Sequence, residues 1–148
     1  MQSIIANPAD GARLRVVGDV MRVLATTEQT GGAYEIFEMQ APEGSGPPPH
    51  AHPWTEAYFM LEGEADVYID GAHMTAGAGS FFQIPAGVTH THRILSQNAR
   101  LVVITSPAGA SHFFGELDAE TAGSCEDMDK VVGIAIKHGF SIPSPASA

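Results

Sequence analysis

The residues with the clearest chemistry are two histidines and a glutamate in residues 44–63, GSGPPPHAHPWTEAYFMLEG. His50 and His52 are two positions apart, so both side chains point to the same face of an extended segment. Glu56 keeps the same parity, and prolines at positions 47, 48, 49 and 53 stiffen the backbone around the pair. Two imidazole nitrogens and a carboxylate oxygen are a ligand set for a first-row divalent metal with open coordination positions.

A second group of histidines lies in residues 79–94, GSFFQIPAGVTHTHRI, after a β-rich run and a Pro-Ala-Gly turn. His90 can supply a third nitrogen to the same metal from a neighbouring strand. His92 shares its parity, and two roles stay open for it. It is either an acid–base group of the pocket, since the pKa of histidine lies near neutrality, or a residue of the wall. The other histidines have no spacing partner and are expected at the surface: His73, His112 and His138.

Two apolar residues share the parity of Glu56. We expect the side chains of Tyr58 and Met60 to face the pocket as well. An aromatic ring and a thioether suit a flat, apolar substrate. The same residues are also ordinary filling for the interior of a β-barrel, and the pattern alone does not separate these roles.

Short β-strands must position these residues, because 16 glycines and 10 prolines punctuate the chain at short intervals. Turn signals such as Glu62-Gly63 and Asp70-Gly71 separate the β-rich runs. This spacing favours a sandwich or barrel over alternating strands and helices. The predicted strands are Arg13–Val17, Met21–Thr26, Ala33–Met39, Glu56–Leu61, Ala65–Ile69, Phe81–Ile84, Thr89–Leu95 and Arg100–Thr105.

The C-terminal part of the chain has a helical pattern. Ser124 is suited to an N-cap, acidic residues follow at positions 126, 127 and 129, and Gly139 is suited to the position after the helix end. We predict one helix over Ser124–His138 and a shorter helical segment over Ala110–Leu117. The tail, residues 141–148, is made of small residues and proline and is expected to be frayed.

Length and composition indicate one domain over residues 1–148. The chain has 17 acidic and 7 basic residues, a formal net charge of −10, and its basic residues are scattered. Nucleic acid and anionic membrane surfaces are therefore poor partners. No apolar run is long enough to span a membrane, and no signal peptide is evident. The single cysteine, Cys125, has no partner for a disulfide within the chain, so we expect a cytoplasmic protein.

The spacing of the histidines and glycines resembles the two sequence motifs of the cupin superfamily. The first motif is complete, as Gly44, His50, His52, Glu56 and Gly63. The second is matched by Gly79, Pro85, Gly87 and His90, whereas Ile94 stands where the family usually has an asparagine. By this resemblance we expect an all-β fold. It would be a double-stranded β-helix, or jelly-roll cupin barrel, over about residues 13–105, with a short C-terminal helical segment.

The resemblance also implies the cofactor and its ligands. We expect one divalent transition metal ion, held by His50, His52, Glu56 and His90. Fe, Mn, Ni, Cu and Zn ions all accept imidazole and carboxylate ligands, so the ligand types do not select among them.

The stretches EAYFMLEGEADVYIDG and LVVITSPAG are similar to quercetin 2,3-dioxygenase-like cupins. This similarity implies a metal-dependent oxidoreductase that acts on a phenolic or enolic small molecule with dioxygen, with Glu56 as the catalytic base. Two alternatives stay open, because the fold does not fix the reaction. One is a non-oxidative metal enzyme such as an isomerase or decarboxylase, and the other is a small-molecule-binding cupin without turnover. Small cupin barrels commonly pair, so a homodimer is expected.

Overall fold

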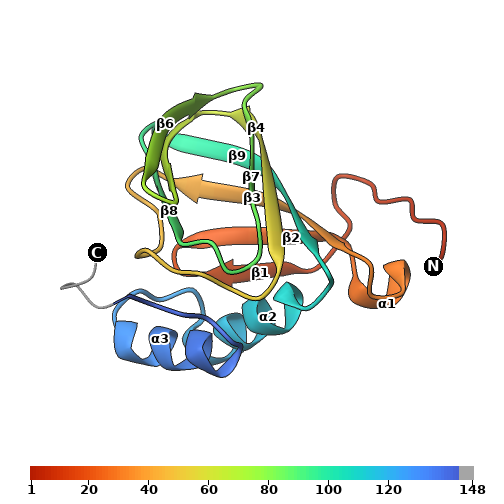
Figure 1. Cartoon of the computed structure of the whole chain (residues 1–148). Coiled ribbons are helices and arrows are strands. Elements are labelled where there is room, and N and C mark those ends of the chain that lie inside the picture. The colour runs from red at the N-terminus through yellow and green to blue at the C-terminus, as the bar shows by residue number, and fades with distance from the viewer. Residues whose placement is uncertain (144–148) are drawn as a thin grey trace.

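Two antiparallel β-sheets build a barrel, and two helices lie together along one side of it (Figure 1). The computed structural model describes residues 1–143. Within these residues the larger sheet has the strand order β1-β2-β3-β9-β4-β7, and the smaller sheet has the order β6-β5-β8. The strands are β1 (Arg13–Val16), β2 (Asp19–Ala25), β3 (Glu35–Pro42), β4 (Thr55–Glu62), β5 (Glu64–Ile69), β6 (Ala72–Gly77), β7 (Phe81–Ile84), β8 (His90–Ile94) and β9 (Asn98–Ser106). The helices are α1 (Thr27–Thr30), α2 (Ala110–Thr121) and α3 (Met128–Lys137).

The large sheet joins strands that are far apart in the sequence. β9 lies between β3 and β4, and Val103 faces Phe37 on one side and Tyr58 on the other. The chain leaves this sheet after β4, forms β5 and β6 in the second sheet, and returns at β7. This arrangement confirms the predicted all-β jelly-roll barrel with short C-terminal helices.

All eight predicted strands are present, with ends that differ by a few residues. One further strand, β6, and one helix, α1, were not predicted from the sequence. β6 has the sequence AHMTAG, and most of its residues are exposed, so it shows no alternation of apolar and polar residues. Pairing with β5 holds it in place, over the register from Glu64↔Gly77 to Ile69↔Ala72. The missed helix, α1, has only four residues and depends on a capping box between Thr26 and Gln29.

The helix boundaries differ from the prediction in two places. α3 begins at Met128 and not at Ser124, because the Asp127 carboxylate accepts a hydrogen bond from the Lys130 amide at 3.1 Å and so acts as the N-cap. α2 continues to Thr121, so at 12 residues it is longer than α3, which has 10. The predicted frayed tail is wrong at Ser141, which pairs with Ala51 through two main-chain hydrogen bonds. Residues 144–148 lie outside the described part of the chain.

Apolar side chains from both sheets meet in the barrel interior, and the helices extend this core. In β9 the buried residues Leu101, Val103 and Thr105 alternate with more exposed ones, as expected for a strand with one covered face. Phe114 of α2 packs its ring edge-on against Phe37 of β3, with the centroids 5.2 Å apart. The fully buried apolar residues include Phe37, Met60, Val67, Ile84, Ile94, Leu101, Val103 and Leu117.

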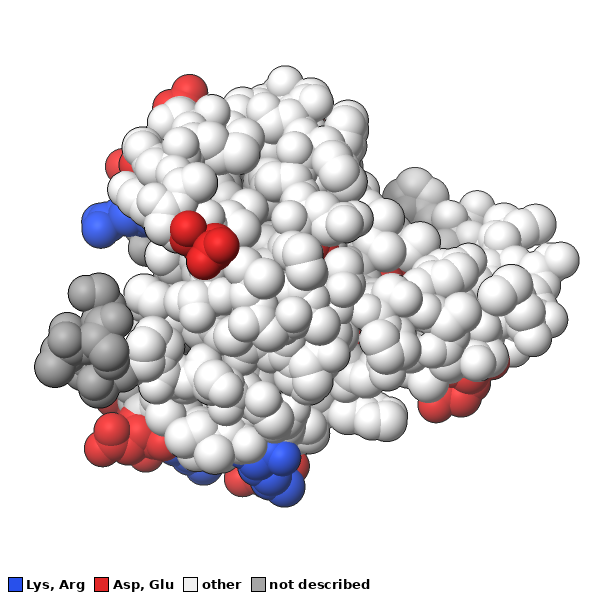
Figure 2. All heavy atoms as spheres, viewed as in Figure 1, with Lys and Arg blue, Asp and Glu red and all other residues white. Residues whose placement is uncertain are grey.

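The outer face of the large sheet carries exposed apolar side chains. Phe59, Phe81 and Ile104 are 42%, 58% and 38% exposed, and they lie on β4, β7 and β9, which are neighbours. The face of the molecule shown in Figure 2 is largely uncharged, with its acidic and basic residues mostly near the edges. The homodimer expected from the sequence stays a prediction. Among residues 1–143, no helix combines the length and the apolar character that a membrane crossing needs.

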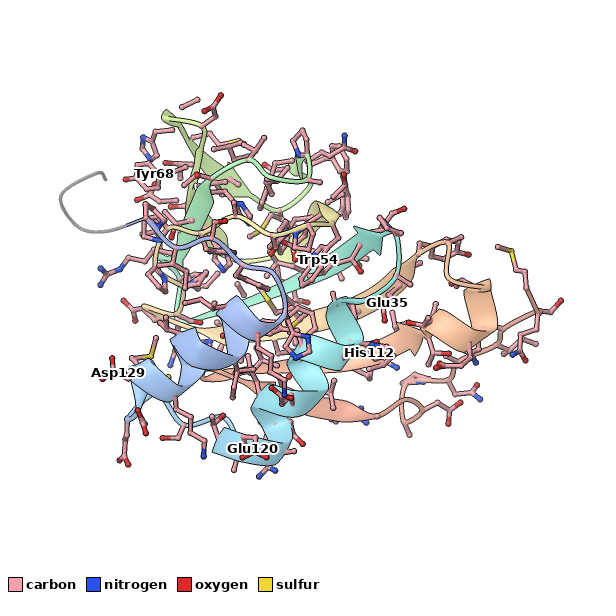
Figure 3. All side chains as sticks on the ribbon, turned by 60° about the horizontal axis from the view of Figure 1, so that its bottom comes forward. Glu35, Trp54, Tyr68, His112, Glu120 and Asp129 are labelled. Atoms are coloured by element: carbon pink, nitrogen blue, oxygen red, sulfur yellow. The ribbon has the colours of Figure 1, made fainter. Side chains whose placement is uncertain are left out.

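A buried carboxylate connects the barrel to α2. Glu35, at the start of β3, is 0% exposed and lies beside the start of α2 (Figure 3). It accepts hydrogen bonds from the hydroxyls of Thr27 (2.8 Å) and Thr105 (3.3 Å), and from the amides of Gly109 (2.9 Å) and Ser111 (3.2 Å). Burial acts to raise the pKa of Glu35, but these hydrogen bonds outweigh it and hold the pKa below its ordinary value.

Replacing this carboxylate should destabilise the fold. In Glu35→Gln the side-chain NH₂ group replaces an oxygen that accepts hydrogen bonds, so it lies against N–H and O–H donors. We therefore expect a loss of about 2–3 kcal/mol in the free energy of unfolding. Because the pKa of Glu35 is depressed in the folded protein, its stabilisation is present at neutral pH and is lost as the pH falls from the usual range of glutamate through the lowered pKa of the folded state. Urea denaturation at neutral and acidic pH measures both effects. The exposed Glu64→Gln is the control, and equal stability of the two variants would contradict the role of Glu35.

Candidate metal centre

Three buried imidazoles converge where the β3–β4 connection meets β8. His50, His52 and His90 are 8%, 4% and 4% exposed, and each offers a ring nitrogen within 4.8 Å of the other two. The main chains of His50 and His90 pair directly, with hydrogen bonds of 3.0 and 2.9 Å in the two directions. The structure therefore brings together the three histidines that the sequence singled out.

Each ring is held by a hydrogen bond from Nδ1 to a main-chain carbonyl two residues away. The acceptors for His50, His52 and His90 are the carbonyl oxygens of Pro48, Trp54 and Val88, all at 2.9 Å. A carbonyl oxygen can only accept, so Nδ1 carries the proton and, in the neutral ring, Nε2 keeps its lone pair. This arrangement orients the rings and leaves Nε2 as the donor atom for a metal.

Glu56 lies at one side of the three histidines. Its Oε2 is 3.0 Å from Nε2 of His52 and 3.5 Å from Nε2 of His90, whereas it makes no such contact with His50. A carboxylate oxygen and an unprotonated Nε2 are both acceptors, so a proton or a cation must lie between them. Nε2 of His90 is buried and has no hydrogen-bond partner among the described residues. The residues present therefore fit a divalent metal ion.

The protonation of the site agrees with this fit. Burial, followed by the neighbouring His90, lowers the pKa of His50 to about 4, so its ring is neutral at physiological pH. Burial acts to raise the pKa of Glu56, but its interactions with His52 and His90 outweigh burial and lower this pKa. Neutral imidazole and ionised carboxylate are the forms in which these side chains bind metals.

A cavity of about 120 Å³ adjoins the histidines, and the C-terminal part of the chain covers one side of it. His50, His52 and Glu56 lie on its wall, while His90 reaches the other histidines from β8 without lining it. Apolar side chains of the helices form the opposite wall: Phe113, Phe114 and Leu117 from α2, and Met128, Val131, Val132 and Ala135 from α3.

Phe140, which follows α3, lies directly against the metal-site residues. Its ring stacks on His50 with a centroid distance of 5.5 Å and an interplanar angle of 20°, and it meets Trp54 edge-on at 5.4 Å. Trp54, which lies between the barrel and α2 in Figure 3, stacks in turn on His52 at 4.6 Å. The pairing of Ser141 with Ala51 fixes this segment beside the histidine pair.

The remaining predicted pocket residues lie in different surroundings. Tyr58 and His92 line the cavity, with their rings 5.9 Å apart. Burial lowers the pKa of His92 to about 4, although Glu56 acts to raise it, so His92 is neutral at physiological pH. Burial and then the charge of Glu56 raise the pKa of Tyr58 well above its ordinary value. Met60 faces inward as expected, but it is 0% exposed within the core and does not line the cavity.

Sequence reasoning missed two polar residues of the cavity wall and all of its helical cover. Asp19 and Ser45 line the cavity and are joined by a hydrogen bond from Ser45 Oγ to Asp19 Oδ1. They are 26 positions apart and match no spacing pattern, so nothing in the sequence connects them. The apolar stripe of α3 was visible, but it did not indicate which part of the barrel the helix covers.

Comparison with known proteins agrees with the fold and the histidine motifs. A family model described as "Cupin domain" matches residues 37–105. Quercetin 2,3-dioxygenase from Bacillus subtilis is 26% identical over 114 residues, which are 76% of this chain and 34% of that protein. The chain thus spans about a third of the length of this relative.

Two solved structures show the same fold. An RmlC-like cupin from Shewanella frigidimarina has a TM-score of 0.64 and 20% identity, over 72% of this chain and 93% of that one. The polyketide cyclase RemF from Streptomyces resistomycificus has a TM-score of 0.61 and 22% identity, over 71% and 80%. The fold and site define a small jelly-roll barrel with a histidine cluster in its interior. Residues 37–105 are similar to the cupin domain, and the fold and the two histidine motifs support a member of the cupin superfamily.

Adding a divalent metal should stabilise the protein through the three histidines. A ligand that binds only the folded state raises the stability by about 2.7 kcal/mol at a concentration of 100 times its Kd. We expect Zn(II) or Mn(II) to raise the Tm of the chelator-treated wild type and to leave the Tm of His90→Ala unchanged. Scanning calorimetry with and without the ion measures this difference.

His73→Ala is the matched control for this experiment, because His73 is exposed and its imidazole contacts Asp66 on the outside of the barrel. This control should respond to the metal as the wild type does. A wild type whose Tm does not respond to either ion, or a His90→Ala variant that responds equally, would rule out the assigned centre.

Proposed function

We propose that this chain is a metal-dependent dioxygenase of small enolic or phenolic compounds. The observation that carries the proposal is the convergence of three buried histidine rings, each held through Nδ1 by a main-chain carbonyl, beside a largely apolar cavity. The similarity to quercetin 2,3-dioxygenase supports the oxidative reaction over other metal chemistry. The cavity supports this substrate class, because it offers mainly apolar contact and few charged groups.

In this proposal some residues of the chain bind the metal, and others bind the substrate. His50, His52, His90 and Glu56 would bind one divalent transition metal ion. Such an ion supplies Lewis acidity, which lowers the pKa of an enol or phenol hydroxyl and orients the resulting anion. Tyr58, Phe140 and the helical side chains would enclose the substrate and exclude water, which protects an electron-rich anion from reprotonation.

The proposed reaction needs dioxygen and no other oxidant or reductant. An enolised β-diketone has a carbon–carbon double bond, and cleaving this bond supplies the electrons that reduce dioxygen. Each of the two carbons then carries one oxygen atom of dioxygen, so the products are a carboxylic acid and a ketoaldehyde. All atoms of the enol and of dioxygen are retained in these products.

The volume of the cavity restricts the size of the substrate. Pockets for drug-sized ligands measure about 300–1,000 Å³, whereas this cavity measures about 120 Å³. A β-diketone or a phenol with one ring suits this volume better than a flavonol with three rings. A flavonol would require Phe140 and the neighbouring helices to move away from the histidines.

Oxygen uptake tests the proposed reaction. We expect protein reconstituted with Fe(II) to consume oxygen with acetylacetone or a phenol with one ring, and we expect His50→Ala to lose both bound metal and uptake. His73→Ala, with an exposed histidine, should retain both. An oxygen electrode and metal analysis of protein purified without chelators give the two readouts. Full metal occupancy without uptake over a broad panel would instead favour a non-oxidative enzyme or a binding protein.

The residue that covers the cavity should control which substrates enter. Phe140→Ala removes a ring that stacks on His50, so it enlarges the space next to the metal-site histidines. We expect its ratio of kcat/KM for a flavonol to that for acetylacetone to rise by about tenfold or more, since each tenfold corresponds to about 1.4 kcal/mol. Ile136→Ala, on the exposed side of α3, is the control and should leave this ratio unchanged. An unchanged ratio in Phe140→Ala would show that the ring does not limit entry.

A further inference from the structure

A second carboxyl group lies on the wall of the cavity, apart from the predicted metal ligands. Asp19 is the first residue of β2 and follows the two-residue turn Val17-Gly18. Val17 and Gly18 both have positive φ, 48° and 88°, which is the pattern of a type I′ hairpin turn. A β-branched residue is strained in this conformation, yet the turn keeps it, and the side chain of Val17 lines the cavity beside Asp19.

Asp19 is held in position through one of its two carboxyl oxygens. Ser45 Oγ donates a hydrogen bond to Oδ1, and Oδ2 accepts none from the described residues. Ser45 is itself fixed by the main chain, because its amide donates to Pro42 and its carbonyl accepts from the Ile94 amide at 2.8 Å. The β3–β4 connection thus orients a carboxyl group that has one oxygen available to a ligand in the cavity.

We propose that Asp19 is the proton acceptor of this cavity, taking the acidic proton of an enol or phenol that binds beside the three histidines. This inference rests on the proposed function for its substrate class. It differs from the sequence-based assignment of the base to Glu56, whose Oε2 is already in contact with His52 and His90. Asp19 makes no hydrogen bond or ion pair with any of these residues, so its Oδ2 can receive a proton without breaking an interaction of the predicted metal ligands.

The surroundings of Asp19 suit this role. Burial raises its pKa to about 6, although the hydrogen bond from Ser45 acts to lower it. A carboxyl group with this pKa is ionised at neutral pH and is a stronger base than an ordinary aspartate. The groups of the cavity wall that titrate are Tyr58 and Glu56 from β4, His92 from β8, and His50 and His52 from the β3–β4 connection, whereas α2 and α3 contribute apolar side chains.

The proton transfer is balanced within the cavity. The O–H bond of the substrate breaks, a new O–H bond forms at Asp19 Oδ2, and the electron pair stays on the substrate oxygen. The substrate thereby becomes an anion, which a bound metal ion would stabilise, and no net proton leaves the protein. Asp19 returns its proton to the product or to water when the product departs.

Proton release on binding tests the inference without turnover. In Zn(II)-loaded wild type at neutral pH, we expect acetylacetone to bind as the enolate, identified by its ultraviolet absorbance, with no proton released to the buffer. Asp19→Asn retains an oxygen that can accept from Ser45 but cannot take up the proton, so it should release about one proton per enolate bound. Calorimetric titrations in two buffers of different ionisation enthalpy count these protons. Asp70→Asn, at an exposed turn, should match the wild type.

Two further measurements separate a proton acceptor from a structural residue. In the Fe(II) protein, Asp19→Asn should lower kcat for oxygen uptake by about 100-fold or more with unchanged metal content. Ser45→Ala keeps the carboxyl group of Asp19 but removes the hydrogen bond that lowers its pKa. Activity should therefore remain, and the acidic limb of the pH profile of kcat should move to higher pH. A purely structural role would leave this limb unmoved.

The outcomes distinguish the two proposals. Equal proton release by wild type and Asp19→Asn, or acetylacetone that does not bind the wild type as the enolate, overturns the role of Asp19. A wild type that consumes no oxygen with any substrate overturns the dioxygenase proposal, while the proton count still decides the role of Asp19. If Asp19→Asn keeps the oxygen uptake of the wild type, the dioxygenase proposal stands, but a residue other than Asp19 must accept the proton.

Discussion

The hydrogen bonds from Nδ1 of three histidines to main-chain carbonyls determine what the interior of this barrel can do. Each carbonyl belongs to a residue two positions from the histidine that it binds, so the local backbone sets the tautomer and the orientation of each ring. The consequence is a group of buried acceptors that face one another and Glu56. Acceptors packed in this way are costly unless a proton or a cation lies between them. The site is therefore built around a positive charge.

The barrel and its helical cover contribute different parts of this environment. The β3–β4 connection and β8 bring the histidines together, and β4 adds Glu56 and Tyr58. The helices contribute the apolar wall, and they are tied to the barrel by the buried Glu35 at one end and by Arg15, which binds Asp118 of α2 at 2.7 Å, at the other. Both parts line the cavity. The low dielectric that strengthens the electrostatics of the site depends on both parts being docked.

The sequence predicted the metal centre better than it predicted the rest of the cavity, and the reason is physical. His50, His52 and Glu56 share a strand period, so their convergence follows from local geometry, and the family resemblance added His90. Asp19 and Ser45 meet only because β2 and the β3–β4 connection line the same cavity, which no local pattern encodes. Met60 obeyed the strand period but lies too deep to reach the cavity. β6 was missed because its position depends on its partner strand and not on its own residues.

The pairing of Ser141 with Ala51 has a consequence for when the three histidines are accessible to a cation. A chain is synthesised from its N-terminus, and folding can begin before synthesis ends. All nine strands and every histidine of the centre precede the segment that carries Phe140 and Ser141. While the ribosome still holds this segment, the barrel can form with its imidazoles open to the surroundings. The order of translation thus leaves the histidines accessible to a cation for a period before the aromatic cover docks.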